Sequence, residues 1–401
     1  MAMKKSIIIL FCAFMYGNVL SQKLSEEATI SVITCGPYQE AVYFAFGHSA
    51  IRVMDSVAGF DYVFNYGVFD FNQPNFYLNF ARGYNYYLLG AYDYQHFKSS
   101  YIEDNRFIHE QILNLTPAQK EKVYNYLIWN AQPENRSYRY DYFYDNCATR
   151  VRDVFAKVLD KDVKFDGSYI TTEYSIRQLT DVYLKQQPWG DLGIDIGLGL
   201  PMDKIASPYE YMFLPAYIES GFDHATISND SATVPLVKEK KIVYESRPEE
   251  VSGLPHPLYV FGAVALIALI LCARDFRNQN ISGWFDVLLF GSAGLLGILL
   301  LMLWFLTDHK AAANNLNLLW ALPTHFIVVF AFIRNPPWLK HYFMIASIFY
   351  LALLAGWFFL PQQLNTALIP IVVALMLRSY IQYVLRKRGV YKRASIARAL
   401  A

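Results

Sequence analysis

A cysteine and a histidine, which together can form a nucleophilic site, stand where the sequence predicts that secondary structure elements begin. Cys147 follows Asp145 and Asn146, residue types that favour helix N-caps, and so falls in the first turn of a helix predicted over 145–159. Unpaired amides and the positive end of the helix dipole stabilise a thiolate at that position. Because the thiolate is the reactive form of cysteine, Cys147 is the candidate nucleophile.

His48 is the best candidate for the base that activates this cysteine, because it opens a strand predicted over 49–54. A turn over 55–59 and a second strand over 61–66 complete an antiparallel hairpin. If this hairpin closes around residues 57–58, Asn65 lies roughly opposite His48 and its neighbours. The side-chain carbonyl of Asn65 then orients the imidazole, and Asp61 is the alternative residue for that role.

A structural role for Cys147 is the alternative to catalysis, with Cys35 as its disulfide partner. Four cysteines are too few for a disulfide scaffold. There is no glycine-rich phosphate loop and no CxxC pair, so nucleotide binding and a zinc ribbon are both unsupported. We therefore predict neither a metal nor another cofactor, and nothing indicates a nucleic-acid partner.

The charges divide the 401 residues into two parts. From residue 256 onward there are three acids against twelve lysines and arginines, and the remaining 31 acids and 23 bases precede it. Only 17% of all residues are charged, whereas soluble domains have about 25%. The sequence therefore predicts an acidic region in water and a basic, apolar region in a membrane.

Five apolar stretches in the second region, 256–401, are each close to the length that crosses a bilayer. They lie near residues 258–273, 284–306, 316–333, 342–360 and 364–385. Lysines and arginines gather after the first stretch, between the third and fourth, and in the tail. Positive charge stays in the cytoplasm, so residues 23–255 are predicted to lie outside it, in the periplasm of a bacterial inner-membrane protein.

The N-terminus has the features of a secretory signal peptide over residues 1–22. Lys4 and Lys5 precede an apolar run of about ten residues, too short to span a bilayer, and a plausible cleavage region follows. Export agrees with the orientation derived from the basic loops. A retained N-terminal anchor is the alternative.

The exported region, 23–255, is long enough for one α+β domain. Besides the hairpin, we predict a strand over 41–45 and a helix over 116–130, in which Thr116, Pro117 and Gln119 are a cap, a first-turn proline and the partner of a capping box. Tyrosine-rich stretches at 84–87, 92–94 and 138–142 suit a membrane-facing surface or a partly buried core.

A second polar cluster is predicted at the outer ends of the second and third spans. It consists of Asp308, His309, Asn314, Asn315, Asn317, Trp320 and His325. Asn317 and His325 are eight residues apart, about two turns of one helix, so both could line one cavity. We expect this cluster to bind a lipid headgroup or an acceptor amine. A headgroup-facing loop with helix-packing hydrogen bonds is the alternative.

Two sets of motifs carry resemblances to known families. The segments FGHSAI (46–51) and DNCAT (145–149), with histidine before cysteine, resemble the circularly permuted NlpC/P60 papain-like group. The segments DYVFNYGVFDF (61–71), YDYFYDNCATR (140–150) and NLLWALP (317–323) are similar to the Lnb family, the lipoprotein N-acyltransferases of Bacteroides and its relatives. The second resemblance covers nearly the whole chain.

The resemblance implies a permuted NlpC/P60 papain-like α+β domain followed by five transmembrane helices. It implies that Cys147 carries an acyl group from a phospholipid as a thioester, that His48 is the base, and that the acceptor is the α-amine of a diacylated lipoprotein. Asn65 fills the third role, and Asn146, beside the nucleophile, is expected to contact the substrate. The rival interpretations are a membrane-tethered peptidoglycan endopeptidase or amidase, and a non-catalytic envelope assembly protein.

Overall fold

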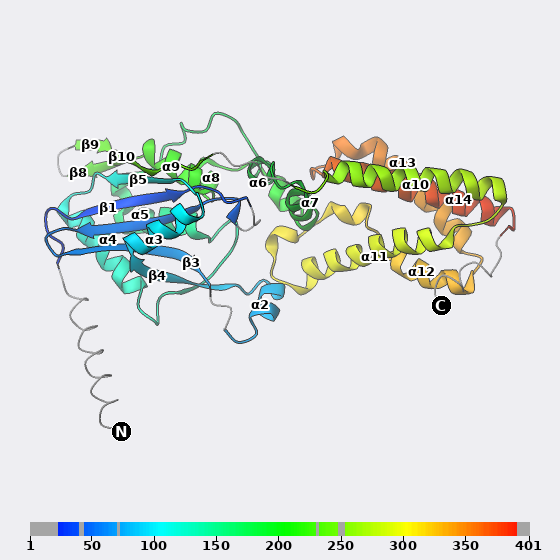
Figure 1. Ribbon diagram of the computed structural model, residues 1–401, viewed down its shortest axis with the longest axis horizontal. Coiled ribbons are helices and arrows are strands. Elements are labelled where there is room, and N and C mark those ends of the chain that lie inside the picture. Colours follow the sequence, from blue (N-terminus) through cyan, green and yellow to red (C-terminus); the bar gives the residue numbers. More distant parts are fainter. Residues whose placement is uncertain (1–22, 40–43, 70–72, 230–231, 248–252, 391–401) are drawn as a thin grey trace, which may run out of the picture. The chain divides into compact units, whose positions relative to one another are not determined.

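The computed structural model describes residues 23–39, 44–69, 73–229, 232–247 and 253–390 (Figure 1). The predicted signal peptide lies outside these residues. The chain divides into two compact units, which we name the sheet unit and the helical unit. The sheet unit contains Met1–Asn79, Tyr84–Glu173 and Ala206–Glu250, and the helical unit contains Phe80–Gly83, Tyr174–Ile205 and Val251–Ala401. Residues 174–205, inside the predicted exported region, thus belong with the membrane-type helices.

An antiparallel seven-stranded sheet forms the centre of the sheet unit, in the order β10-β5-β1-β2-β3-β4-β6. A second sheet has the order β7-β8-β9. The strands are β1 (Thr29–Cys35), β2 (His48–Asp55), β3 (Phe60–Val68), β4 (Tyr86–Asp93), β5 (Ile108–Leu113), β6 (Ser137–Arg139), β7 (Val163–Lys164), β8 (Thr226–Asn229), β9 (Ala232–Pro235) and β10 (Val237–Tyr244).

The predicted hairpin is confirmed by β2 and β3, whose register runs from Asp55 opposite Phe60 to Ile51 opposite Phe64. Asp55 holds the turn, because its carboxylate accepts hydrogen bonds from the amides of Val57 and Ala58 at 3.1 and 3.0 Å. The strand predicted over 41–45 is wrong where it can be compared. Residues 44–45 form a turn, and residues 40–43 lie outside the described residues.

Helices cover both faces of the large sheet. Tyr94 and Phe97 of α3 share a buried cluster with Ile33, Ala50 and Val63. Residues 51, 53 and 64 are also buried and, by strand alternation, point to the opposite face, where α5 packs on β2 and β3. The helices of this unit are α3 (Tyr94–Glu103), α4 (Pro117–Asn130), α5 (Cys147–Leu159), α8 (Pro208–Tyr211) and α9 (Pro215–Asp223), and α2 (Phe76–Arg82) is divided between the two units.

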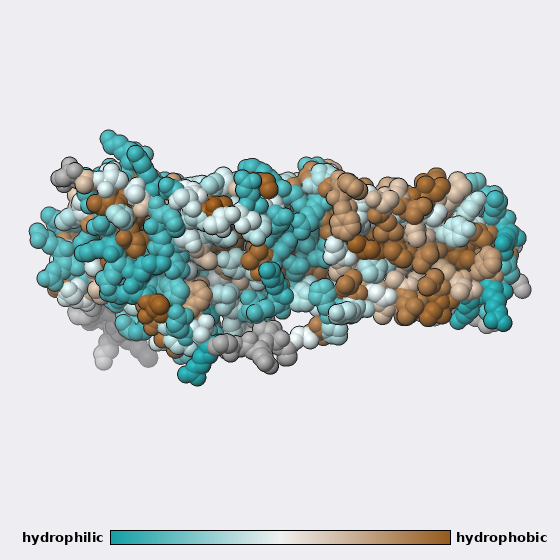
Figure 2. Space-filling model, turned by 90° about the horizontal axis from the view of Figure 1, so that it is seen from above, coloured by the Kyte–Doolittle hydropathy of each residue, from teal (hydrophilic) through white to brown (hydrophobic). Residues whose placement is uncertain are grey.

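The helical unit carries the membrane-type helices. Four described helices are long and apolar enough to cross a membrane, and a bent pair, Lys310–Leu319 with Thr324–Arg334, raises the number to five. Their large apolar side chains are exposed, as the hydrophobic surface in Figure 2 shows. The helices are α6 (Ile176–Leu184), α7 (Pro188–Gly197), α10 (Pro257–Asn278), α11 (Gly283–Leu306), α12 (Thr324–Arg334), α13 (Leu339–Gly356) and α14 (Ile369–Lys387).

The third predicted span is not one continuous helix. The segment Lys310–Leu319, which ends in the short helix Leu316–Leu319, meets α12 at an angle of 43°, with Pro323 between them. Gly294 and Gly297 of α11 lie against this bend, where an added Cβ atom would come within 2.3 Å of the Phe326 nitrogen and 2.0 Å of the Ala321 oxygen. Only glycine allows the two backbones to approach this closely.

A buried ion triad joins three of the long helices. Arg378 of α14 contacts Asp275 of α10 at 2.9 Å and Asp286 of α11 at 2.6 Å. Gln382, one turn along α14, donates to Asp286 at 2.5 Å. All of these side chains are almost completely buried. Because removing one partner leaves uncompensated charge among apolar helices, the triad couples their positions.

Arg378→Leu should destabilise the helical unit by about 3–5 kcal/mol, because the variant leaves two buried carboxylates without their cation. The thermal unfolding midpoint of the purified full chain measures this effect. Arg334→Leu, at an exposed position on α12, is the matched control and should change the midpoint little. Equal losses in the two variants would contradict a specific role for the triad.

The orientation derived from the basic loops predicts where reporter fusions are active. Fusions after Arg277 and after Arg388 should report the cytoplasm, and a fusion after Ala312 should report the periplasm. Alkaline phosphatase and a fluorescent protein that folds only in the cytoplasm give complementary signals. A cytoplasmic signal after Ala312 would overturn the orientation.

Candidate active site

The nucleophile stands at the start of α5, where a capping box holds the helix end. The side-chain oxygen Oδ1 of Asn146 accepts from the Thr149 backbone amide at 2.9 Å, and the Thr149 hydroxyl oxygen accepts from the Asn146 backbone amide at 2.8 Å. The Asn146 side-chain NH₂ donates to the carbonyls of Tyr142 at 2.9 Å and Phe213 at 2.8 Å. Asn146, expected to contact the substrate, is buried and uses its amide group to position Cys147.

The proposed base stands at the first residue of β2. The chain enters this strand through Gly47, which has φ +82°, and a side chain there would press against the Cys35 carbonyl. His48 Nε2 lies 2.6 Å from Asn65 Oδ1 on the neighbouring strand. Because this oxygen can only accept, Nε2 carries the hydrogen, and Nδ1 is left with a lone pair that can take a proton.

The structure brings Cys147 and His48 into hydrogen-bond contact. Burial raises the pKa of the Cys147 thiol, but the charge and hydrogen bond of His48 and the amides of Ser49 and Ala148 outweigh it, so the net pKa is lowered. Cys35 has no comparable partner set, and burial raises the pKa of its thiol strongly. Both thiols are free in the structure, which therefore does not contain the alternative disulfide between Cys35 and Cys147.

Aromatic side chains surround the thiol. Tyr87 stacks on Tyr140 with ring centroids 4.3 Å apart, and Tyr140 lies edge-on to Tyr142 at 6.5 Å. Burial, and next the charge of Cys147, raise the pKa values of Tyr140 and Tyr142 well above their usual range. These phenols therefore stay neutral, and their rings give the nucleophile an apolar surround that restricts water.

Gly67 of β3 leaves space beside the nucleophile. A Cβ atom at this position would lie 3.6 Å from the Cys147 Cβ, 4.0 Å from His48 Cε1 and 4.0 Å from the Tyr140 ring. Its φ of +91° also disfavours other residues. The space that a side chain would fill is where a reacting carbonyl can approach both Cys147 and His48.

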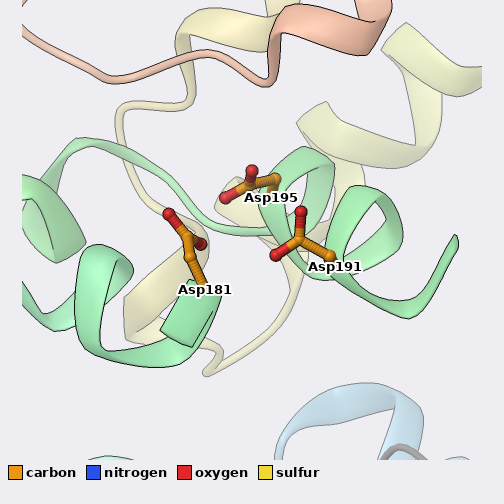
Figure 3. A group of neighbouring side chains, drawn as sticks. All are labelled: Asp181, Asp191 and Asp195. Carbon is orange, nitrogen blue, oxygen red and sulfur yellow. The ribbon is translucent and has the colours of Figure 1, made fainter. Parts of the chain in front are cut away.

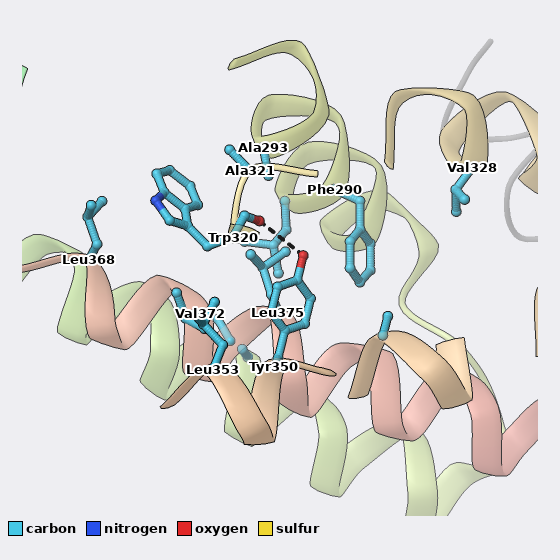
Figure 4. Close-up of a cluster of buried hydrophobic side chains, with 14 of the residues drawn as sticks. Phe290, Ala293, Trp320, Ala321, Val328, Tyr350, Leu353, Leu368, Val372 and Leu375 are labelled. Atoms are coloured by element: carbon cyan, nitrogen blue, oxygen red, sulfur yellow. Dashed lines mark hydrogen bonds between the residues drawn. The ribbon is translucent and has the colours of Figure 1, made fainter. Parts of the chain in front are cut away.

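In the helical unit, three of the predicted site residues belong to one hydrogen-bonded chain. Asn317 accepts from the Trp320 indole at 2.8 Å. The Trp320 carbonyl accepts from Tyr350 at 3.0 Å (Figure 4). Tyr350 also bonds His325, whose other ring nitrogen bonds Tyr342 at 2.7 Å. The prediction that Asn317 and His325 share one helix is wrong, because the chain bends between them. The polar side-chain atoms of Asn317 and His325 form hydrogen bonds with other residues of the helical unit.

Asp308 and His309 lie outside that chain, in the segment that follows α11. Both are half-buried, and the Asp308 amide donates to the Arg82 carbonyl at 2.8 Å. Gly83 lies so close to this segment that an added Cβ atom would come within 3.0 Å of the Asp308 backbone. The structure thus separates the two residues from the hydrogen-bonded chain that contains Asn317, Trp320 and His325.

The fold and the site together define a membrane protein with an α+β domain that carries a Cys-His-Asn constellation. Two family models match the sequence: the Lnb N-terminal periplasmic domain over residues 20–182, and the Lnb transmembrane domain over residues 249–389. The chain therefore belongs to the Lnb family. No curated protein and no solved structure matches it.

Sequence reasoning did not identify Gly67, the ring of Tyr140 or the amide of Ser49 as parts of the site. The Ser49 amide follows directly from the position of His48, so the strand start was a usable signal. Tyr140 belongs to a tyrosine-rich stretch for which a surface and a core were both open alternatives. Its place beside Cys147 depends on the stack with Tyr87, a contact between distant parts of the chain.

The lowered pKa of Cys147 predicts how its reactivity depends on pH. Thiolate increases as the pH rises through the pKa, so alkylation of wild-type Cys147 should reach half its maximal rate at a lower pH than in His48→Ala, which lacks the main stabilising charge. Iodoacetamide labelling of the Cys147 peptide, followed by mass spectrometry, measures this shift. His96→Ala, at an exposed position on α3, is the control and should follow wild type. Coincident profiles for wild type and His48→Ala would rule out activation by His48.

Proposed function

We propose that this chain is a lipoprotein N-acyltransferase of the bacterial inner membrane. It transfers an acyl chain from a phospholipid, through a thioester on Cys147, to the α-amine of a diacylglyceryl-cysteine lipoprotein. The observation that carries the proposal is the contact of Cys147 with His48, which Asn65 orients at 2.6 Å, in a domain covalently attached to membrane-type helices. The order of histidine before cysteine supports a permuted NlpC/P60 papain-like domain.

The first half-reaction forms the thioester. The Cys147 sulfur attacks the ester carbonyl of the phospholipid while His48 Nδ1 takes the thiol proton. The tetrahedral intermediate then collapses, the bond from carbonyl carbon to ester oxygen breaks, and His48 returns the proton to the departing lysophospholipid. Asn65 holds the imidazole with Nδ1 toward the sulfur, so the same atom serves both proton transfers.

The second half-reaction resolves the thioester. The neutral α-amine attacks the acyl carbon, His48 takes a proton from the nitrogen, and the carbon–sulfur bond breaks. His48 then returns the proton to the Cys147 sulfur, which completes the amide and restores the free enzyme. The aromatic surround formed by Tyr140 and Tyr142 supports amine transfer over hydrolysis, because it restricts access of water to the thioester.

Cys147→Ala should abolish N-acylation, and His48→Ala should reduce it by about 10²- to 10⁴-fold, the usual contribution of a general base. Asn65→Ala should cost less than His48→Ala, because Asn65 only orients the ring. Cys35→Ser is the matched control and should retain activity, since Cys35 is a neutral buried thiol. Mass spectrometry of a lipoprotein N-terminus in cells that depend on each variant measures the product.

The rival functions give different results in the same set of variants. A peptidoglycan endopeptidase or amidase would cleave muropeptides in a Cys147-dependent manner and leave the lipoprotein N-terminus unchanged. A non-catalytic assembly protein would keep its cellular role in Cys147→Ala. Either outcome would reject the acyltransferase proposal.

A further inference from the structure

The helical unit contains a cavity of about 800 Å³ that the proposed chemistry does not use. Its walls come from α6 and α7 and from residues 357–366, which connect α13 and α14. His256, which caps the start of α10, also lines it. The match to the periplasmic domain ends inside α6, at residue 182, and α7 follows it. Among the described residues no candidate span separates these helices from α10, so the cavity lies at the periplasmic ends of the long helices.

Three carboxylates converge on this cavity: Asp181 from α6, and Asp191 and Asp195 from α7 (Figure 3). One oxygen of each lies within 4.8 Å of the others. Asp195 pairs with the buried Arg177 at 2.8 Å, and the same arginine pairs with Asp203 at 3.0 Å. One guanidinium thus serves two acids, while Asp181 and Asp191 accept hydrogen bonds from the neutral amides of Gln363 and Asn365.

Acids outnumber bases at this cavity: Asp181, Asp191, Asp195 and Asp203 stand against Lys185, which also lines it, and the paired Arg177. Burial and the neighbouring carboxylates raise the pKa of Asp181 to about 8 and that of Asp191 to about 6. At neutral pH, Asp181 therefore keeps a proton that it would lose if a cation entered the cavity. The electrostatics favour a positively charged occupant.

Two residues that line the cavity each have a buried side-chain atom without a hydrogen-bond partner among the described residues. Trp357 is 3% exposed, and its indole N–H has no acceptor. Asp191 Oδ1 is buried and has no donor, although the other oxygen of this carboxylate is bonded to Asn365. Buried polar groups are nearly always hydrogen-bonded, so an unpaired donor and an unpaired acceptor on one cavity point to a ligand that supplies both.

We propose that this cavity binds the primary ammonium group of a membrane-anchored lipid, with the ammonium on Asp181, Asp191 and Asp195. An acceptor group of the same molecule meets the Trp357 N–H, and its apolar part lies along Phe358, Leu360 and Leu364, which line the cavity beside the acids. Two sources share this chemistry: an ethanolamine phospholipid and the α-amine of a lipidated cysteine. The inference extends the proposed acyl transfer by giving its amine-bearing substrates a binding site.

The spacing of the acids and the size of the cavity fit an ammonium group that belongs to a larger molecule. Three acceptors that surround a nitrogen tetrahedrally at about 2.8 Å are about 4.6 Å apart, and the oxygens of the three acids lie within 4.8 Å of one another. The Asn365 NH₂ donates to Asp191 at 3.1 Å and to Asp195 at 3.0 Å. The cavity, at about 800 Å³, is far larger than one ion, so a cation bound to the acids leaves room for the rest of a larger molecule.

Binding is measured without turnover by using the full chain with Cys147→Ala in nanodiscs of phosphatidylglycerol. One arm titrates a fluorescent phosphatidylethanolamine, and the other titrates a diacylated lipopeptide with a free α-amine. The N-acetylated form of each molecule is its control, because it keeps the lipid and loses the ammonium. We expect at least about tenfold weaker binding of the N-acetylated form in the arm that corresponds to the natural ligand.

Asp191→Asn should weaken binding of that amine by a similar factor, and Asp181→Asn supplies a second test. Both leave the Arg177–Asp195 pair intact. Glu134→Gln, at an exposed turn of the sheet unit, is the matched control. Thermal unfolding checks that each variant folds. We expect Asp191→Asn and Asp181→Asn to lose binding and Glu134→Gln to keep it. The arm in which this loss is seen, phosphatidylethanolamine or lipopeptide, then identifies the source of the ammonium.

Equal binding of amine and N-acetylated forms in both arms would overturn the inference. Saturable binding of Ca²⁺ or Mg²⁺ that Asp191→Asn abolishes, with no preference for amines, would replace it by a metal site. Because the assay uses a chain that cannot form the thioester, its result is independent of acyl transfer. Amine binding without N-acylation in wild type would reject the proposed function and leave the cavity assignment standing.

Discussion

The hydrogen bonds of the Asn146 side chain hold the reactive centre in place. A single amide group caps the first turn of α5 through Thr149 and ties it to the carbonyls of Tyr142 and Phe213. These bonds fix the helix end whose dipole and amides favour the Cys147 thiolate. A one-sided cap would satisfy the helix and still allow it to tilt. Bonds to both sides restrict that tilt and so help to keep the thiol close to His48, as proton transfer requires.

Much of this arrangement was predictable, because it rests on local rules. The Asn146 cap, the capping box at Thr116 and Gln119, and the β2–β3 hairpin follow from residue types at short spacing, and each is found. The hairpin register then brings Asn65 next to His48. What local rules could not predict are contacts between distant segments. The stack of Tyr87 on Tyr140 is one example, and the carboxylate cavity, which joins residues 181–195 to residues 357–365, is another.

The third span shows why counts of apolar residues fail at breaks. Residues 316–333 are apolar enough for a single crossing, yet the chain bends after Leu319. Polar groups freed by the bend must find partners in an apolar setting. The chain from Asn317 through Trp320 and Tyr350 to His325 provides them. Polar residues that looked like a binding face thus also have a structural reason, since an unpaired group at that depth would cost several kcal/mol.

The hydrogen-bonded side chains from Asn317 to His325 differ from those of the carboxylate cavity. The comparison distinguishes polar groups that serve the fold from polar groups that serve a ligand. In the set from Asn317 to His325, each donor has an acceptor, so these side chains need no ligand to complete their hydrogen bonds. In the cavity, one arginine serves two of four acids, and the described part of the structure supplies no partner for the Trp357 donor or for one Asp191 acceptor. A fold that only needed stability would replace such a set with apolar residues, which cost less to bury. The unpaired groups are therefore best explained by a ligand. In the proposed reaction, the helical unit then selects the amine and the sheet unit activates the acyl group.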